Sequence, residues 1–233
     1  MIPLIGYGDR LSGRPGDTIE FKVSSISAEP FSVALYRSIS ADPNPAGPGI
    51  IERRVHSAMD GEYLSRLQPF HSGSYAISDE DLSVTANGFT LRATIWPTLP
   101  EKGEQVILSS GGVILLIDDN GAISGRAGEL HVAASKPLKT RTWYRVWLTY
   151  DADEGTLTTG YEPLKRGHGA QSTIKASNLV LNGRPVIGAL EENGIRAHFN
   201  GKIEAPAIKD GAGLVLAEWD FSRDFSSIRI HDN

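Results

Sequence analysis

A strand, an acidic turn and a return strand are predicted for residues 142–157. Large apolar side chains stand at every second position of the first segment: Tyr144, Val146, Leu148 and Tyr150. A period of two places these side chains on one face of a half-buried strand, because successive strand residues point to opposite sides. Asp151 begins the turn, and Gly155 precedes the return strand. A chain built on such a hairpin must pair it with further strands.

Other segments repeat the alternation. Residues 17–24, 31–36 and 89–96 carry apolar side chains at every second position, and residues 113–117 are apolar throughout. The last pattern predicts a central strand that is covered on both faces. Five Asn-Gly pairs separate the segments, and both residue types tolerate the positive φ of tight hairpin turns. No window of helical length has a 3.6-residue apolar stripe. We therefore predict an all-β, antiparallel jelly-roll sandwich.

Composition excludes several classes of function. The chain has 233 residues, a formal net charge of −5 and no cysteine. The acidic balance argues against general nucleic-acid affinity. Without cysteine, the chain has no disulfide, no thiolate metal site and no cysteine nucleophile. We see no signal peptide and no membrane-spanning segment, so the expected location is cytoplasmic.

We expect two units along the chain. Residues 1–68 form a small β-rich unit with a Pro/Gly-rich insert at residues 42–49, which the three prolines exclude from regular structure. This insert is a flexible loop or a rigid arm that packs on a partner. Residues 69–233 form the jelly roll, with an entry strand near residues 71–77. Residues 224–233 lack a closing element, which suggests a disordered tail or a chain cut from a longer one.

Three stretches resemble one enzyme family. They are residues 4–7, 9–12 and 15–21, residues 42–49 with 68–75, and residues 217–224. Together they resemble the N-terminal region of the large subunit of N,N-dimethylformamidase-like proteins, over nearly the whole chain. The insert is the most specific piece. The hairpin at residues 142–157 resembles laminin-G/concanavalin A-like jelly rolls, which many unrelated families share.

The resemblance implies an accessory role. In that family the large subunit is much longer, and its amide-hydrolysing site holds a mononuclear iron through tyrosines and a glutamate in the later region. No residue of this chain matches those ligands, so the resemblance implies no catalytic residue and no cofactor here. The implied partners are the rest of a longer large subunit and a small subunit.

Carboxylates on the predicted strand near residue 218 raise the possibility of a glycoside hydrolase. Glu218 and Asp220 lie two residues apart and share a face in an extended strand. Retaining glycosidases use paired carboxylates as nucleophile and acid/base. The third carboxylate of the jelly-roll glycosidase pattern is missing, since Ser222 and Arg223 occupy its place. We favour a structural role, in which Glu218 and Asp220 pair with Arg223 or cap a turn.

Two acidic turns are weak calcium candidates. Asp118 and Asp119 lie in one turn, and Asp151 and Asp153 lie in the other. Carboxylate oxygens suit Ca²⁺, a hard cation. Asp and Asn are also the usual residues of hairpin turns, where they bond their own backbone. Neither run matches a known calcium loop, so we expect no metal site.

One polar face of the hairpin is the candidate binding surface. Trp143, Arg145 and Trp147 alternate with the apolar positions and therefore point away from the predicted core. Such a face could stack on sugar rings or pack against a partner, and the burial habit of Trp favours packing. His71, in the resembling segment, is expected to pack or to form hydrogen bonds rather than to act as a ligand or base.

The expected function is therefore a non-catalytic accessory or assembly module of a dimethylformamidase-like amidohydrolase. The alternative is a carbohydrate-binding, lectin-like module, for which carbohydrate would be the partner. A glycoside hydrolase using Glu218 and Asp220 ranks last, because its set of carboxylates is incomplete.

Overall fold

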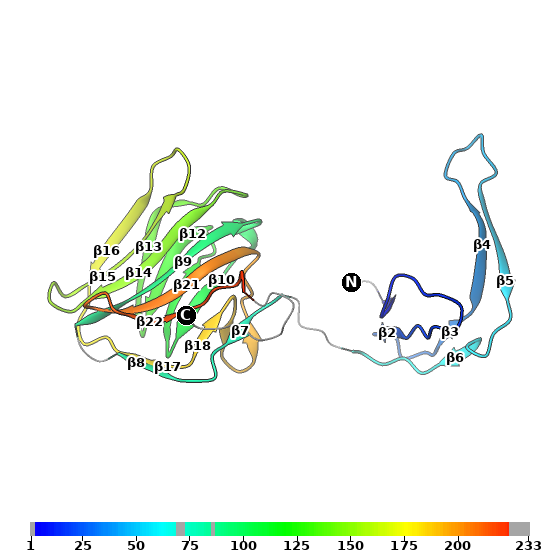
Figure 1. Cartoon of the computed structure of the whole chain (residues 1–233), viewed down its shortest axis with the longest axis horizontal. Helices are drawn as coiled ribbons and strands as arrows, with labels where there is room; N and C mark the ends of the chain where they lie inside the picture. Colours follow the sequence, from blue (N-terminus) through cyan, green and yellow to red (C-terminus); the bar gives the residue numbers. More distant parts are fainter. Residues whose placement is uncertain (1–2, 69–72, 85–86, 224–233) are drawn as a thin grey trace. The chain divides into compact units, whose positions relative to one another are not determined.

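The chain divides into two compact units, Met1–Phe70 and His71–Asn233. The structure is a computed structural model that describes residues 3–68, 73–84 and 87–223 (Figure 1). His71 and residues 224–233, for which we made predictions above, lie outside the described residues.

Two six-stranded antiparallel sheets form the second unit, which confirms the predicted all-β jelly-roll sandwich. The first sheet has the order β13-β12-β11-β10-β18-β7, and the second has the order β16-β15-β14-β9-β21-β22. The strands of the first sheet are β7 (Ala76–Ile77), β10 (Gln105–Ser110), β11 (Val113–Ile117), β12 (Ala122–Ala127), β13 (Leu130–Pro137) and β18 (Pro185–Ile187). Those of the second are β9 (Gly88–Pro97), β14 (Tyr144–Asp151), β15 (Thr156–Pro163), β16 (Ala170–Lys175), β21 (Gly201–Asp210) and β22 (Val215–Glu218).

The described residues of this unit also form two short strand pairs and one helical turn. The pairs are β8 (Leu82–Val84) with β17 (Leu181–Gly183), and β19 (Leu190–Glu191) with β20 (Ile195–Arg196). A 3₁₀ turn, η1, covers Pro100–Lys102. Among the described residues, no helix has the length and apolar character needed to cross a membrane.

The core lies between the two sheets. The alternate residues Phe89, Leu91, Ala93 and Ile95 of β9 are buried, as are Tyr144, Val146, Leu148 and Tyr150 of β14. These two strands pair in antiparallel register at the middle of the second sheet. The predicted alternation of both segments is confirmed, because the sheet turns only one face toward the core.

Strand β11 is buried along its whole length, as its continuous apolar sequence predicts. One face, with Val113, Leu115 and Ile117, joins the core between the sheets. The other face carries Ile114 and Leu116, which pack in a smaller buried cluster on the opposite side of the sheet. The β19–β20 pair contributes Leu190 to that second cluster.

The Asn-Gly pairs do not all form hairpin turns. Asn120-Gly121 connects β11 to β12, and Asn193-Gly194 connects β19 to β20. Asn182-Gly183 instead lies inside β17, and Gly201 begins β21. The hairpin between β10 and β11 is closed by Gly111-Gly112, both with positive φ. A Cβ at Gly111 would lie 1.9 Å from the carbonyl oxygen of Asn182, so the close backbone approach requires glycine there.

The described residues of the first unit form three separate strand pairs. They are β1 (Leu4–Gly8) with β2 (Phe21–Ser25), β3 (Phe31–Val33) with β6 (Gly61–Tyr63), and β4 (Leu35–Ala41) with β5 (Ile50–Val55). Residues 42–49 form the loop between β4 and β5, which run as a long two-stranded ribbon in Figure 1. No hydrophobic side chain between residues 3 and 68 is buried.

Candidate functional site

The outward face of the second sheet holds the predicted binding surface. On β14, Arg145 and Trp147 alternate with the buried residues and point away from the core. Trp143 precedes the strand by one residue, and its carbonyl accepts a hydrogen bond from the Leu164 N–H at 2.9 Å. Arg145 is exposed, whereas both tryptophans are half-buried. The three residues therefore follow the central strand β14 on a mixed polar and aromatic face.

A continuous row of residues crosses this face through Trp147. Strand pairing aligns one residue from each of the six strands, in the order Gln171, Gly160, Trp147, Arg92, Ala207 and Glu218. The indole of Trp147 lies over Gly160, since a Cβ there would be 2.7 Å from its Cζ2 atom. Arg92 Nη2 donates to Glu218 Oε1 at 2.8 Å and spans the small, fully buried Ala207.

Threonines flank this row on one side. Thr90, Thr149, Thr158 and Thr173 lie in register across four strands. Thr90 bonds Thr149 at 3.0 Å and Thr158 bonds Thr173 at 2.9 Å, each through hydroxyl oxygens. Cross-strand hydroxyl pairs of this kind stabilise a sheet. They also use part of the hydrogen-bonding capacity that a ligand would need.

The other two tryptophans have different environments. Trp96 lies on the outward side of β9, and the Lys202 ammonium is 5.0 Å from the centre of its ring. Trp219 is buried in the core. A stacking platform on the outward face would therefore use Trp147 with Trp143 or Trp96, and never Trp219.

Glu218 and Asp220 have separate partners. Glu218 is the last residue of β22, and it pairs with Arg92. Asp220 lies beyond the strand, where it accepts hydrogen bonds from the Ser222 N–H at 2.8 Å and from the Ser222 hydroxyl at 2.6 Å. These bonds, helped by Arg223, hold the pKa of Asp220 below its usual value. A general acid needs a raised pKa, so the environment of Asp220 suits a turn cap.

The aspartates of the acidic turns bond backbone groups. Asp118 Oδ1 accepts from Asn120 N–H at 2.9 Å and Ala122 N–H at 3.0 Å. Asp119 Oδ1 accepts from Glu104 N–H, and Asp151 Oδ1 accepts from Glu154 N–H. Asp153 is exposed in the turn after β14. Within the described part of the chain, no three His, Asp or Glu side chains gather in a way that could hold a metal ion.

Sequence reasoning missed Arg92 as a member of the outward face. The sequence contained the necessary pattern. Buried and outward residues alternate along β9, so the burial of Leu91 and Ala93 turns Arg92 outward. Its partner Glu218 is 126 residues away in the sequence, and only strand order brings the two together.

These observations define an all-β jelly-roll sandwich with a mixed aromatic and charged outward face, joined to a small β-rich unit. In sequence, the chain is similar to the N,N-dimethylformamidase beta subunit of Paracoccus aminophilus, with 29% identity over 95% of this chain. The beta subunit of the same enzyme from an Alcaligenes species is 30% identical, also over 95% of the chain. The chain spans 36% of the length of each relative. No protein-family model matches the chain.

Two solved structures are similar to parts of this chain. One is a putative carbohydrate-binding protein from Bacteroides ovatus. The match covers 88% of this chain and 60% of the Bacteroides chain, with a TM-score of 0.45 and 19% identity. The other is the LG1–3 region of the laminin alpha2 chain. The match covers 71% of this chain and 35% of the laminin chain, with a TM-score of 0.46 and 10% identity.

Proposed function

We propose that this chain is a non-catalytic assembly module of the large subunit of an N,N-dimethylformamidase-like amidohydrolase. The similarity to two beta subunits supports the enzyme class. The observation that carries the assembly role is the apolar surface of the first unit, where no hydrophobic side chain between residues 3 and 68 is buried. Such a surface is unfavourable in water and marks an interaction site.

The β4–β5 ribbon concentrates this surface. Strand register places Leu35, Ile51 and Val55 on one side of the ribbon, and Tyr36 and Ile50 on the other. All five side chains are exposed, and Ile50 reaches 74%. An isolated two-stranded ribbon is at best marginally stable, so apolar residues on both sides favour a partner that covers it.

Unpaired arginines indicate the chemistry of that partner. Arg37 and Arg53 stand directly opposite each other on the same side of the ribbon. Like charges in this position repel. Arg54, on the other side, pairs with Asp60 at 3.1 Å, whereas no carboxylate of the described residues lies within ion-pair distance of Arg37 or Arg53. A partner with carboxylates beside an apolar surface would relieve the repulsion, and the remaining part of a longer large subunit and a small subunit are the candidates.

The proposed lack of catalysis is tested directly. The resemblance places the iron-binding site of the parent enzyme in the later region of the large subunit, outside the matched segment. We expect the purified chain, supplied with ferrous or ferric iron, to release no dimethylamine from N,N-dimethylformamide above the rate of buffer with iron. Turnover by the chain alone would refute the non-catalytic assignment. The cytoplasmic location stays a prediction.

The assembly role predicts a loss of binding when the ribbon is made acidic. The probe is the Paracoccus aminophilus beta subunit from which the matched segment has been deleted, supplied as a separate chain. We expect it to copurify with this chain, and we expect Ile50→Asp to weaken binding about tenfold, equal to about 1.4 kcal/mol. The control is Leu214→Asp, which alters another strongly exposed aliphatic residue, in the second unit, and should bind like wild type. Equal binding of wild type and Ile50→Asp would contradict the role of the ribbon.

The carbohydrate-binding alternative is favoured by one observation. Trp147 lies over Gly160 beside the Arg92–Glu218 pair, so an aromatic surface adjoins charged hydrogen-bonding groups, as sugar recognition requires. If Trp143, Arg145 and Trp147 bind sugar, Trp147→Ala should reduce binding on a polysaccharide array about tenfold. An unchanged array pattern in this variant would dispose of a sugar site on the outward face.

A further inference from the structure

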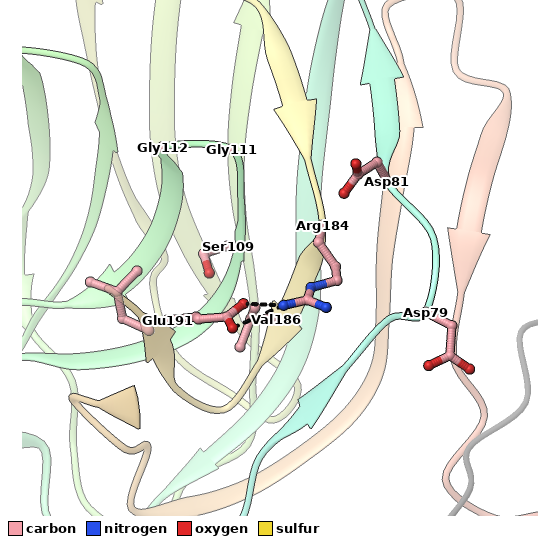
Figure 2. A pocket seen from close by; sticks show the side chains of 9 residues that line it. Asp79, Asp81, Ser109, Gly111, Gly112, Arg184, Val186 and Glu191 are labelled. Carbon is pink, nitrogen blue, oxygen red and sulfur yellow. Dashed lines mark hydrogen bonds and ion pairs between the residues drawn. The ribbon is translucent and has the colours of Figure 1, made fainter. Parts of the chain in front are cut away.

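A polar pocket of about 570 Å³ lies beside strands β10 and β18 of the first sheet, and its lining contains none of the hairpin residues considered above. The β10–β11 turn, the start of β18, strand β19 and the segment between β7 and β8 supply its lining (Figure 2). Its polar side chains are Asp79, Asp81, Ser109, Arg184 and Glu191. The predicted sites include none of these residues.

Ser109 supplies a hydroxyl group to the lining of the pocket. The residue is only 4% exposed, yet its hydroxyl has no hydrogen-bond partner among the described residues. The neighbouring Ser110, by contrast, donates to the Gly183 carbonyl at 2.7 Å. Figure 2 shows the Ser109 oxygen turned toward the Arg184–Glu191 pair. A hydroxyl that opens into a pocket without a protein partner is free to bond a ligand as donor and as acceptor.

Arg184 and Glu191 fix the next part of the pocket. Arg184 Nη2 donates to both carboxylate oxygens of Glu191, each at 2.9 Å. Nε and Nη1 of Arg184 make no hydrogen bond to the described residues, so this guanidinium is held in place and keeps donors available. Asp81 is exposed above it without an ion-pair partner in the described part of the chain (Figure 2). The pocket thus presents the Asp81 carboxylate as an acceptor and the Arg184 guanidinium as a donor. The Ser109 hydroxyl can both donate and accept a hydrogen bond.

The charge and composition of the lining restrict the ligand. Three carboxylates and one guanidinium give a formal charge of −2, which disfavours anionic ligands. The positive charge of Arg184 disfavours a small cation. Among the described residues, no group of three His, Asp or Glu side chains could hold a metal ion, in this pocket or elsewhere. The lining has no aromatic side chain for stacking. A neutral ligand with neighbouring hydroxyl groups matches the set, because each hydroxyl both donates and accepts.

We propose that this pocket binds a neutral sugar or polyol through a pair of adjacent hydroxyl groups. One hydroxyl donates to Asp81 and the other accepts from Arg184, while Ser109 bonds the ligand from below. Glu191 holds Arg184 in position and acts as a positioning residue. The proposal is independent of the assembly role, which concerns the other unit of the chain.

Titration of the isotope-labelled chain with sugars, followed by amide chemical shifts, tests the proposal. The probes are glucose, galactose, mannose and sorbitol, with glucuronate as the anionic comparison. We expect at least one neutral probe to shift amides of residues 109–112 and 184–191, with a dissociation constant of about 1–10 mM, the weak range for a few hydrogen bonds at an open site. We expect glucuronate to bind more weakly than glucose.

Two variants and one control assign the site. Asp81→Asn should weaken binding about tenfold or more, because hydrogen bonds to a charged group contribute most. Ser109→Ala should weaken it about fivefold and leave the melting temperature unchanged, since no protein hydrogen bond is lost. Glu80→Gln, an equivalent change on the same segment outside the pocket, should bind like wild type. Wild-type binding by Asp81→Asn, shifts confined to the outward face of the second sheet, tighter binding of glucuronate, or no shift with 50 mM of any probe would each overturn the proposal.

Discussion

Replacing Leu148 with alanine is expected to lower the free energy of unfolding of the second unit by about 3–5 kcal/mol. Leu148 is fully buried at the centre of β14, with Leu91 of β9 beside it and Gly125 of the first sheet opposite. Truncation removes apolar area from the core and leaves a cavity between two sheets that are each held by regular hydrogen bonding. The cavity therefore cannot collapse at low cost.

Tryptophan fluorescence during urea unfolding measures this change for the second unit alone, because all four tryptophans lie between residues 96 and 219. The control is Arg145→Ala, an exposed position on the same strand, for which we expect a change within about 0.5 kcal/mol. A loss below about 1 kcal/mol for Leu148→Ala would contradict the packing of the two sheets described above.

The alternation of apolar residues predicts the strands well where the chain also supplies a core. For β9 and β14, every second residue is buried because a second sheet covers that face. For residues 17–24 the same pattern misled us: the strand begins only at Phe21, whose side chain is 56% exposed. Residues 31–36 likewise divide between β3 and β4. Alternation shows which side chains favour burial, but it does not show what covers them.

Asn-Gly pairs predict hairpin turns less reliably than their frequency in this sequence suggests. Asn-Gly favours positive φ locally, yet Asn182-Gly183 lies in a strand because β17 pairs with β8 there. Gly111-Gly112 closes a hairpin whose geometry is set by the approach of Asn182. Contacts between distant segments decide these positions, and a local sequence pattern does not contain them.

The candidate sites depend even more on long-range pairing. The outward direction of Arg145 and Trp147 follows from the strand pattern alone. The Arg92–Glu218 pair and the polar pocket require the order of strands in each sheet, which brings together segments from both halves of the second unit. In the first unit, the sequence predicted the insert between β4 and β5 as a flexible loop or a rigid arm, but it did not predict the exposed apolar ribbon that carries the insert.

The contact between Gly125 and Leu148 gives the second large expected effect. A Cβ on Gly125 would lie 2.2 Å from Leu148 Cδ1 and 3.0 Å from its Cγ, across the space between the sheets. The backbone of Gly125 does not have a positive φ, so alanine fits its conformation and only the packing opposes it. Overpacking of this kind costs about 1–3 kcal/mol, which we expect for Gly125→Ala in urea unfolding.

Combining the two substitutions should reverse the sign of the Gly125 effect. In the Leu148→Ala background the clashing methyl groups are gone, and the new Cβ fills part of the cavity. Gly125→Ala should then be neutral or stabilising, with a coupling energy of about 1–3 kcal/mol between the sites. Leu181→Ala is the matched background, since this equally buried leucine belongs to the separate β8–β17 pair and Gly125→Ala should there cost as much as in wild type. Additive effects of Gly125→Ala and Leu148→Ala would mean that these two residues do not face each other, and that the sheets pack in a different alignment from the one described.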